Sequence, residues 1–113
     1  PAYPMEESQV RERIMAGLNR SYAPMGTLRQ MVAIAADTGR AKELATITTP
    51  TLVLHGKADP LVPFACGQDT AQRIPGARLF GIDGMGHDLP PEVIDLMLPT
   101  MLEHLHTSNG TLA

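Results

Sequence analysis

The apolar positions near the amino terminus follow a helical repeat. Within residues 5–20, Val10, Ile14 and Leu18 recur every four positions, and charged side chains occupy much of the remaining surface. A stripe of this kind is typical of an amphipathic helix that packs one face against other parts of a protein. We therefore predict a helix over residues 5–20.

A second helix is predicted after a break. Residues 21–26 contain a proline and a glycine, both of which interrupt helical structure. Thr27 suits an N-cap, apolar residues continue to Ala36, and Gly39 stands where a C′ glycine would end the helix. The two helices share several methionines, at Met5, Met15, Met25 and Met31. Such adaptable side chains suit a lid over a pocket, and they equally suit the filling of a core.

The pattern changes at residue 47. Leu52, Val53 and Leu54 are consecutive and apolar, without the alternation of a half-exposed strand. This is typical of a parallel strand that is covered on both faces. A loop with two prolines follows, and then a helix over residues 64–74 and a second strand over residues 77–82 are predicted.

One long helix is predicted near the carboxyl terminus. It opens at Pro90 and Pro91, because proline suits the first turn of a helix, and it carries a broad apolar stripe. Pro99 lies inside that stripe and should kink the helix or end its first half. Residues 107–113 are small and polar, and we expect them to fray.

The order of these elements predicts an α/β fold with a parallel sheet covered by helices. A strand that is apolar on both faces needs a neighbour on each edge, and this chain supplies at most one. An open edge would promote aggregation. We therefore expect the missing neighbours to come from residues outside this chain or from a second copy of it.

Composition and charge exclude several classes of function. The 113 residues are 43% hydrophobic and 19% charged with a net charge of −3, which is ordinary for a soluble globular protein. Acids and bases are interleaved, so there is no basic stripe for nucleic acid. No apolar run approaches the roughly 20 residues of a membrane span.

The termini and the cysteine content bear on location. The single Cys66 cannot form an intrachain disulfide, which fits a reducing compartment, and we predict a cytoplasmic protein. The first residues lack the features of a secretory signal. A chain that starts at Pro1, without an initiator Met, is expected to begin inside a longer polypeptide or to have been processed.

Two ionisable residues stand just beyond the predicted strands. Asp59 follows the first strand and His87 follows the second, and reactive groups gather at the carboxyl ends of parallel strands. An aspartate bonded to Nδ1 of a histidine fixes the tautomer and leaves Nε2 as a general base. Gly84 and Gly86 precede His87 and permit a tight loop that aims it into a cleft.

These segments resemble the α/β-hydrolase superfamily. Residues 47–63, ITTPTLVLHGKADPLVP, are similar to its acid strand and loop, and IPGA at residues 74–77 with GMGHDLP at residues 84–90 are similar to its last strand and histidine loop. The resemblance implies that Asp59 is the acid and His87 the base of a catalytic triad. Residues 5–43 are similar, more loosely, to the cap of ester-cleaving members such as aclacinomycin methylesterase-like hydrolases.

The resemblance implies a division of the chain. Residues 1–43 would be the end of a helical cap or lid, residues 44–106 the carboxy-terminal part of an α/β-hydrolase core, and residues 107–113 a tail. The implied activity is hydrolysis of a small-molecule ester without a cofactor. The scaffold also supports dehalogenation, epoxide opening and C–C cleavage, and an inert, partner-paired or domain-swapped module is a further alternative.

The triad nucleophile has no candidate in this chain. The family places its serine in a G-x-S-x-G turn ahead of the acid, and neither Ser8, Ser21 nor Ser108 has that setting. Cys66 follows the acid and is a poor substitute. We therefore expect the nucleophile to lie upstream of Pro1.

The remaining candidates have ordinary alternatives. Asp59 before Pro60 is also a common turn residue. The side chains that flank the acid and base are predicted to line a substrate pocket or to be part of the core; they are His55, Val62, Met85 and Leu89. No metal site is predicted, because His104 and His106 fall on different faces of a helix.

Overall fold

The computed structural model describes residues 2–37 and 39–109. These residues form two compact units. The first comprises the residues from Ala41 onward together with the segment before Met5, and the second comprises Met5–Arg40. The units are considered separately below.

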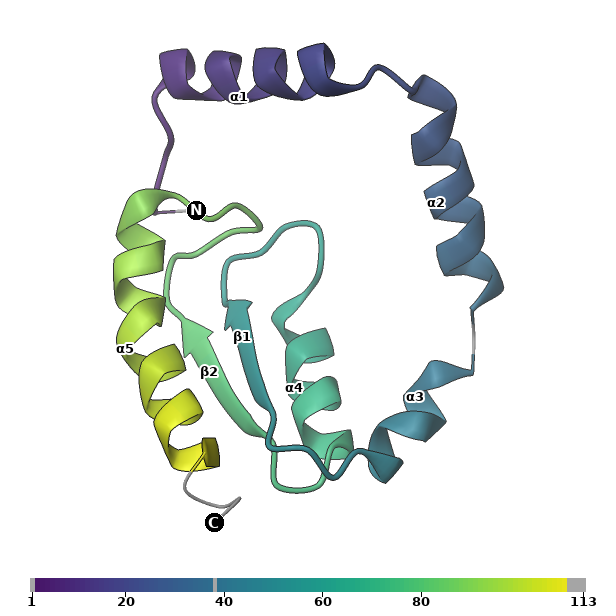
Figure 1. Cartoon of the computed structure of the whole chain (residues 1–113), viewed down its shortest axis with the longest axis vertical. Coiled ribbons are helices and arrows are strands. Elements are labelled where there is room, and N and C mark those ends of the chain that lie inside the picture. The colour runs from purple at the N-terminus through teal and green to yellow at the C-terminus, as the bar shows by residue number, and fades with distance from the viewer. Residues whose placement is uncertain (1, 38, 110–113) are drawn as a thin grey trace. The chain divides into compact units, whose positions relative to one another are not determined.

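The unit Met5–Arg40 contains two helices, α1 (Glu7–Arg20) and α2 (Pro24–Ala36) (Figure 1). The start of α1 lies two residues after the predicted one. Helix α2 begins at Pro24 rather than near Thr27, and it ends at Ala36, the last apolar residue of the predicted run, so Gly39 is not its C′ residue. Proline occupies the first turn of this helix, where its missing N–H is not needed, and Asp37 is the C-cap.

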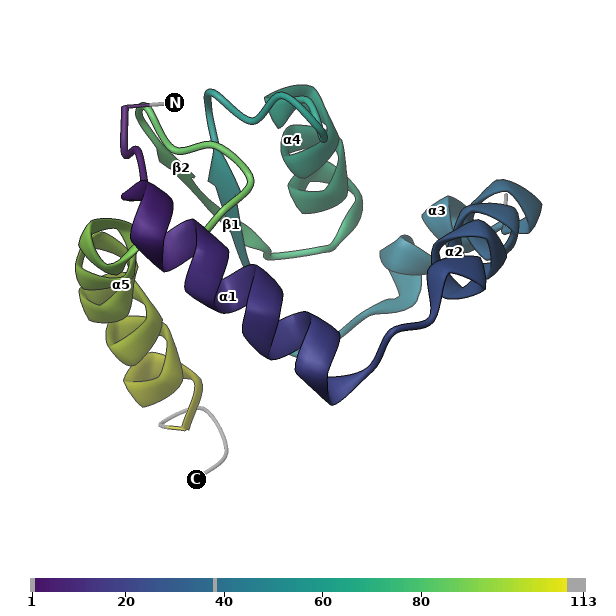
Figure 2. The ribbon, with the colours of Figure 1, turned by 90° about the horizontal axis from the view of Figure 1, so that it is seen from above.

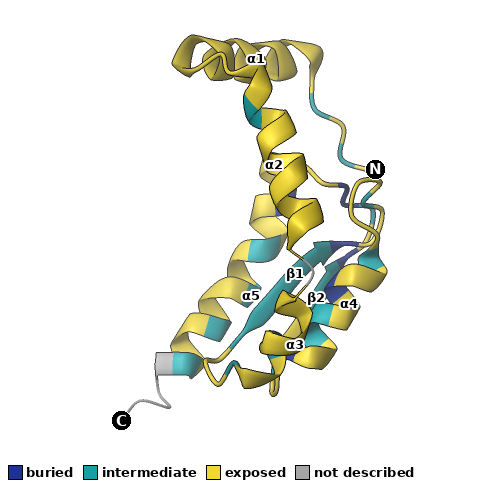
Figure 3. Cartoon of the chain, turned by 90° about the vertical axis from the view of Figure 1, so that its right-hand side faces the viewer, coloured by how far each residue is buried: buried dark blue, intermediate teal, exposed yellow. Residues whose placement is uncertain are grey.

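Both helices are exposed along their length. Neither contains a buried residue (Figure 3). Their apolar side chains therefore face solvent in this chain, including Val10, Ile14 and Leu18 of α1 and Leu28, Met31 and Val32 of α2. The apolar stripe predicted for α1 exists, and it is exposed.

The other unit has the predicted strand–helix–strand–helix order. A short helix α3 (Arg40–Glu43) and a 3₁₀ turn η1 (Leu44–Thr46) lead to β1 (Leu52–Gly56), α4 (Phe64–Arg73), β2 (Arg78–Ile82) and α5 (Pro91–Asn109). The two strands pair in parallel, as predicted, and form a two-stranded sheet.

The register of this pair decides which side chains share a face. Leu54 lies beside Phe80, His55 beside Gly81, and Gly56 beside Ile82. Because side chains alternate along a strand, Phe80 and Ile82 project to one face and Gly81 to the other. Helices α4 and α5 lie on opposite sides of the strands (Figures 1 and 2).

Helix α5 buries the core of this unit. Val93, at the start of α5, is fully buried and packs with Ile82 and Met85. Three partly buried side chains surround this cluster, namely Tyr3, Phe80 and Met97. The core thus lies between β2 and α5, directly beneath the loop that follows β2.

Helix α5 is longer than predicted. It continues through Pro99, which therefore does not end the helix, and runs to Asn109. Residues 107–109, which were predicted to fray, are part of the helix, and the Thr107 hydroxyl bonds to carbonyl oxygens of the preceding turn. Residues 110–113 lie outside the described residues. Across the described chain, no helix is both long and apolar enough to cross a membrane.

The buried position of Val93 makes its removal costly. Val93→Ala deletes two methyl groups from the only fully buried side chain among the described residues, and we expect it to lower the free energy of unfolding by about 2 kcal/mol. Leu98→Ala, on the same helix but exposed, should cost less than about 0.5 kcal/mol. Urea unfolding followed by circular dichroism measures both. Equal costs would contradict the core placed at Val93.

Candidate active site

The acid loop, defined here as residues 57–63, is shaped by the carboxylate of Asp59. One oxygen, Oδ1, accepts hydrogen bonds from the backbone N–H of Leu61 at 2.8 Å and of Val62 at 2.9 Å. An aspartate that bonds two and three residues ahead closes a tight turn on itself. The turn therefore fixes the carboxylate just beyond the end of β1.

The histidine loop, defined here as residues 83–90, turns at Gly84. The φ angle of Gly84 is 71°, in the left-handed region that favours glycine. The prediction that Gly86 also serves a special backbone angle is wrong, because positive φ occurs only at Gly76 and Gly84 among the described residues. Gly86 is instead buried.

Backbone hydrogen bonds join the acid loop to the end of β2 and to the histidine loop. The N–H of Lys57 donates to the carbonyl of Ile82 at 3.0 Å, and the N–H of Ala58 donates to the carbonyl of Met85 at 3.0 Å. The N–H of Ala2 also donates to the carbonyl of Gly84 at 2.7 Å. The loop that carries His87 is thus held at two backbone positions, Gly84 and Met85.

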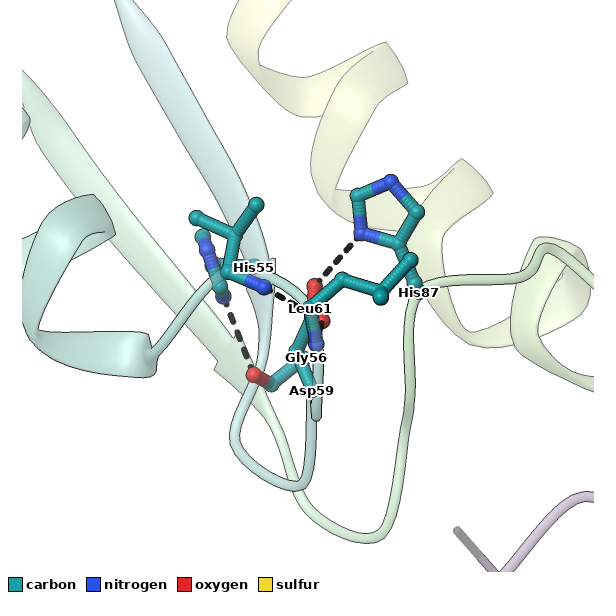
Figure 4. A network of polar contacts seen from close by, with 6 residues as sticks. His55, Gly56, Asp59, Leu61 and His87 are labelled. Carbon is teal, nitrogen blue, oxygen red and sulfur yellow. Dashed lines mark hydrogen bonds and ion pairs between the residues drawn. The ribbon is translucent and has the colours of Figure 1, made fainter.

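The loops bring Asp59 and His87 into contact. His87 Nδ1 lies 2.8 Å from Asp59 Oδ2 (Figure 4). The carboxylate is nearly inaccessible, with 5% of its side chain exposed, whereas 51% of the His87 side chain is exposed. Because an ionised carboxylate only accepts hydrogen bonds, Nδ1 carries the proton and Nε2 is left to accept one.

The surroundings of Asp59 favour its charged form. Desolvation of the carboxylate opposes ionisation, but the hydrogen bonds from the Val62 N–H, the His87 ring and the Leu61 N–H outweigh it. Together they lower the pKa of Asp59 from 3.8 to about 2. The group is therefore an anion at neutral pH and is suited to hold a positive imidazolium.

The predicted pocket residues have different surroundings. Val62 is partly exposed, and its N–H bonds Asp59. Leu89 is exposed in the histidine loop. Met85 is buried in the core with Ile82 and Val93, which is the alternative left open for it.

His55 faces α4. Its ring makes an edge-to-face contact with Phe64, with centroids 5.7 Å apart, and its Nδ1 donates to the carbonyl of Gly56 at 2.9 Å. A side chain at Gly67 of α4 would collide with this ring. His55 is one residue before the end of β1, and its ring therefore packs against α4.

No nucleophile accompanies the pair within the described residues. His87 forms no hydrogen bond to a serine or cysteine there; its bond is to Asp59. Ser108 belongs to the opposite end of the strands, where it lines a hollow of about 190 Å³ with Thr51 and Arg78. A second hollow, of about 340 Å³, is lined by α1 residues. Neither hollow includes Asp59 or His87.

The backbone groups that build the site were missed by sequence reasoning. Two alternatives were predicted for Asp59, a turn residue or a triad acid, and the structure shows that one carboxylate forms both the turn and the bond to His87. The spacing of Asp59, Leu61 and Val62 is that of an Asx turn and was a usable signal. The bonds between the two loops had no signal in the sequence.

The parallel strand pair, with Asp59 and His87 beyond its carboxyl ends, agrees with part of an α/β-hydrolase fold. The family described as "serine aminopeptidase, S33" matches residues 7–93, and the chain belongs to that family within the α/β-hydrolase superfamily. The predicted fold class is thereby confirmed.

Two relatives of the chain are methylesterases. The chain is 42% identical over 65 residues to rhodomycin D methylesterase DauP of Streptomyces sp. (strain C5), and 38% identical over 65 residues to the methylesterase DnrP of Streptomyces peucetius. Each match covers 58% of this chain and 22% of the relative. The chain thus matches about a fifth of the length of these proteins.

Two further likenesses concern the fold. The α/β-hydrolase superfamily protein YisY of Bacillus subtilis (strain 168) is 36% identical over 62 residues, which are 55% of this chain and 23% of that protein. The crystal structure of an α/β hydrolase enzyme, MGS-MChE2, from the metagenome of sediments of the Mar Chica lagoon, Morocco, superposes with a TM-score of 0.56. That likeness has 28% identity and covers 80% of this chain and 44% of the other.

The lowered pKa of Asp59 has a consequence for stability. A carboxylate whose pKa is lower in the folded chain than in the unfolded chain stabilises the fold above about pH 4 and loses that contribution as the pH falls through about 2. Asp59→Asn keeps an acceptor for the Leu61 and Val62 N–H groups but cannot titrate. We expect its free energy of unfolding to fall less steeply with acid than that of the wild type.

Urea unfolding at several pH values between about 5 and 2 measures these slopes. Asp69→Asn is the matched comparison, since the Asp69 pKa is lowered by its hydrogen bond with Arg73 in an exposed pair. Exposed pairs contribute little, so its slope should change less. Parallel profiles for the wild type and Asp59→Asn would contradict the assignment.

Proposed function

We propose that the protein containing this chain is a serine hydrolase that cleaves a small-molecule carboxylic ester. Asp59 is the acid and His87 the general base, and the nucleophilic serine is contributed by residues upstream of this chain. The observation that carries the proposal is the 2.8 Å contact between His87 Nδ1 and Asp59 Oδ2, with the ring half exposed. No cofactor is required.

The geometry supports a specific division of labour. His87 Nε2 takes the proton of the serine hydroxyl as the oxygen attacks the ester carbonyl, and then returns that proton to the departing alcohol. Water repeats the sequence on the acyl-enzyme and releases the acid. Asp59 stays ionised, because its pKa is about 2, and it stabilises the imidazolium in both half-reactions.

The choice of an ester rests on the relatives. Two of them are rhodomycin D methylesterases, so a carboxylic methyl ester is the substrate class that the likeness favours. The fold alone does not fix the reaction. Dehalogenation, epoxide opening and C–C cleavage are the alternatives within enzymes, and the identity of the upstream nucleophile distinguishes them.

The proposal predicts a division of activity between polypeptides. The 113-residue chain should not hydrolyse p-nitrophenyl acetate above the buffer rate, whereas the same chain joined to the residues that precede it in its gene should do so. In the longer protein, His87→Ala and Asp59→Asn should each lower kcat roughly 10⁴-fold. His104→Ala, a histidine on α5 outside the pair, should leave kcat unchanged.

Two results would contradict this proposal. Turnover by the 113-residue chain that disappears in His87→Ala would place the nucleophile inside the chain. An upstream sequence without G-x-S-x-G or an equivalent strand-to-helix turn would remove the serine mechanism.

A second candidate is a module without activity of its own, whose sheet is completed by another copy of the chain. The specific observation is the two-stranded sheet, since β1 and β2 pair with each other and each keeps one edge unpaired within the described residues. Unpaired edges are templates for association.

Light scattering separates the two candidates. Both predict that the 113-residue chain associates as its concentration rises, because its strand edges are open. Only the first predicts that the residues upstream of the chain abolish this association when they are present. A monomer at high concentration without those residues would count against the open-edge argument itself.

A further inference from the structure

Gly56 is the last residue of β1, and it lies against the backbone of the histidine loop. A Cβ atom built on Gly56 would come within 2.5 Å of the carbonyl oxygen of Gly86 and closer still to that of Met85. Gly56 is buried, and its φ is not positive. Alanine would therefore suit the backbone conformation here, and only the close approach of the other loop excludes it.

This contact joins the end of the strand that leads to Asp59 with the loop that carries His87. The peptide that touches Gly56 directly precedes His87, and Gly56 itself lies three residues before Asp59. Around it, the N–H groups of Lys57 and Ala58 donate to carbonyls of the strand and loop that lead to His87. The loops are thus joined backbone to backbone, without an intervening side chain.

We infer that Gly56 is a positioning residue for the pair. Because its Cα carries no side chain, the Met85–Gly86 peptide lies directly on the end of β1, and this close approach sets the 2.8 Å separation of His87 Nδ1 from Asp59 Oδ2. The inference deepens the proposed function and rests on it for the claim that the pair is catalytic.

The magnitudes support this role. A carbon and an oxygen at 2.5 Å are roughly 1 Å inside their normal contact distance, so a methyl group on Gly56 must displace backbone by about that amount. The Asp59–His87 bond at 2.8 Å becomes weak beyond about 3.2 Å. The required displacement exceeds the tolerance of the bond.

The same strand pair offers a matched control. Gly81 lies one position earlier in β2, and a Cβ built on it would meet the ends of the Phe64 and Lys57 side chains, the nearest atom at 2.7 Å. Side-chain ends can move aside, whereas the carbonyls beside Gly56 belong to the backbone of the loop. Gly81→Ala is therefore the same substitution in the same sheet without the effect on His87.

The tautomer of His87 reports the contact without any need for activity. In the neutral ring, the proton is on Nδ1 while Asp59 accepts it, and it should move to Nε2 when that bond is lost. Long-range ¹H–¹⁵N NMR spectra of the longer protein distinguish the two forms, and His87→Ala assigns the signals.

We expect the Nδ1–H form in the wild type and in Gly81→Ala, and the Nε2–H form in Gly56→Ala and in Asp59→Ala. Retention of the Nδ1–H form in a folded Gly56→Ala variant would overturn the inference. A change in Gly81→Ala equal to that in Gly56→Ala would also overturn it, because any loosening of the sheet would then suffice.

A measurement on the wild type keeps the inference testable if Gly56→Ala does not fold. The amide of Ala58 should exchange with solvent at least about tenfold more slowly than in an unstructured peptide, since it donates to Met85. Exchange at the unstructured rate would show that the two loops are not joined at this contact.

Kinetics of the longer protein complete the test. A positioning role predicts that Gly56→Ala lowers kcat about 10²-fold with KM unchanged, and a normal kcat in a variant with the Nε2–H tautomer would overturn it. If the longer protein shows no ester hydrolysis in any form, the proposed function fails, while the tautomer comparison still decides the contact at Gly56.

Discussion

The parallel register of β1 and β2 is the constraint on which the site depends. Pairing of Gly56 with Ile82 ends both strands at the same level, so the two loops that leave them start side by side. The short distance from each strand end to its functional residue then leaves little freedom. A shift of one residue in this register would reverse the faces of every side chain and separate Asp59 from His87.

The carboxylate of Asp59 has both a structural and a chemical role. One oxygen closes the turn of the acid loop and the other receives the His87 ring. The backbone donors that shape the loop also lower the pKa of the group, so the turn itself keeps the carboxylate charged. When the acid loop folds, the Asp59 carboxylate is therefore already charged and in place to bind the His87 ring.

The two units differ in how much apolar surface they bury. The unit with the strands buries a small cluster around Val93, directly under the histidine loop, so the few buried side chains support the candidate site. The unit Met5–Arg40 buries none. Its apolar stripes are those of helices that pack against other structure, which agrees with a chain that matches about a fifth of its esterase relatives.

The sequence by itself determined the order of the main helices and strands and the positions of the two ionisable residues relative to the strands. The run Leu52–Leu54 predicted a parallel strand, which the structure confirms as β1, although these residues are half-buried rather than covered on both faces. The positions of Asp59 and His87 beyond strand ends followed from that prediction. Three further points could be decided only from the structure, because proline, small polar residues and methionine each suit two settings. They are the start of α2 at Pro24, the helical residues 107–109 and the core position of Met85. The contact at Gly56 was decided by tertiary structure alone, since a glycine's use depends on which backbone approaches it, and that partner lies nearly thirty residues away.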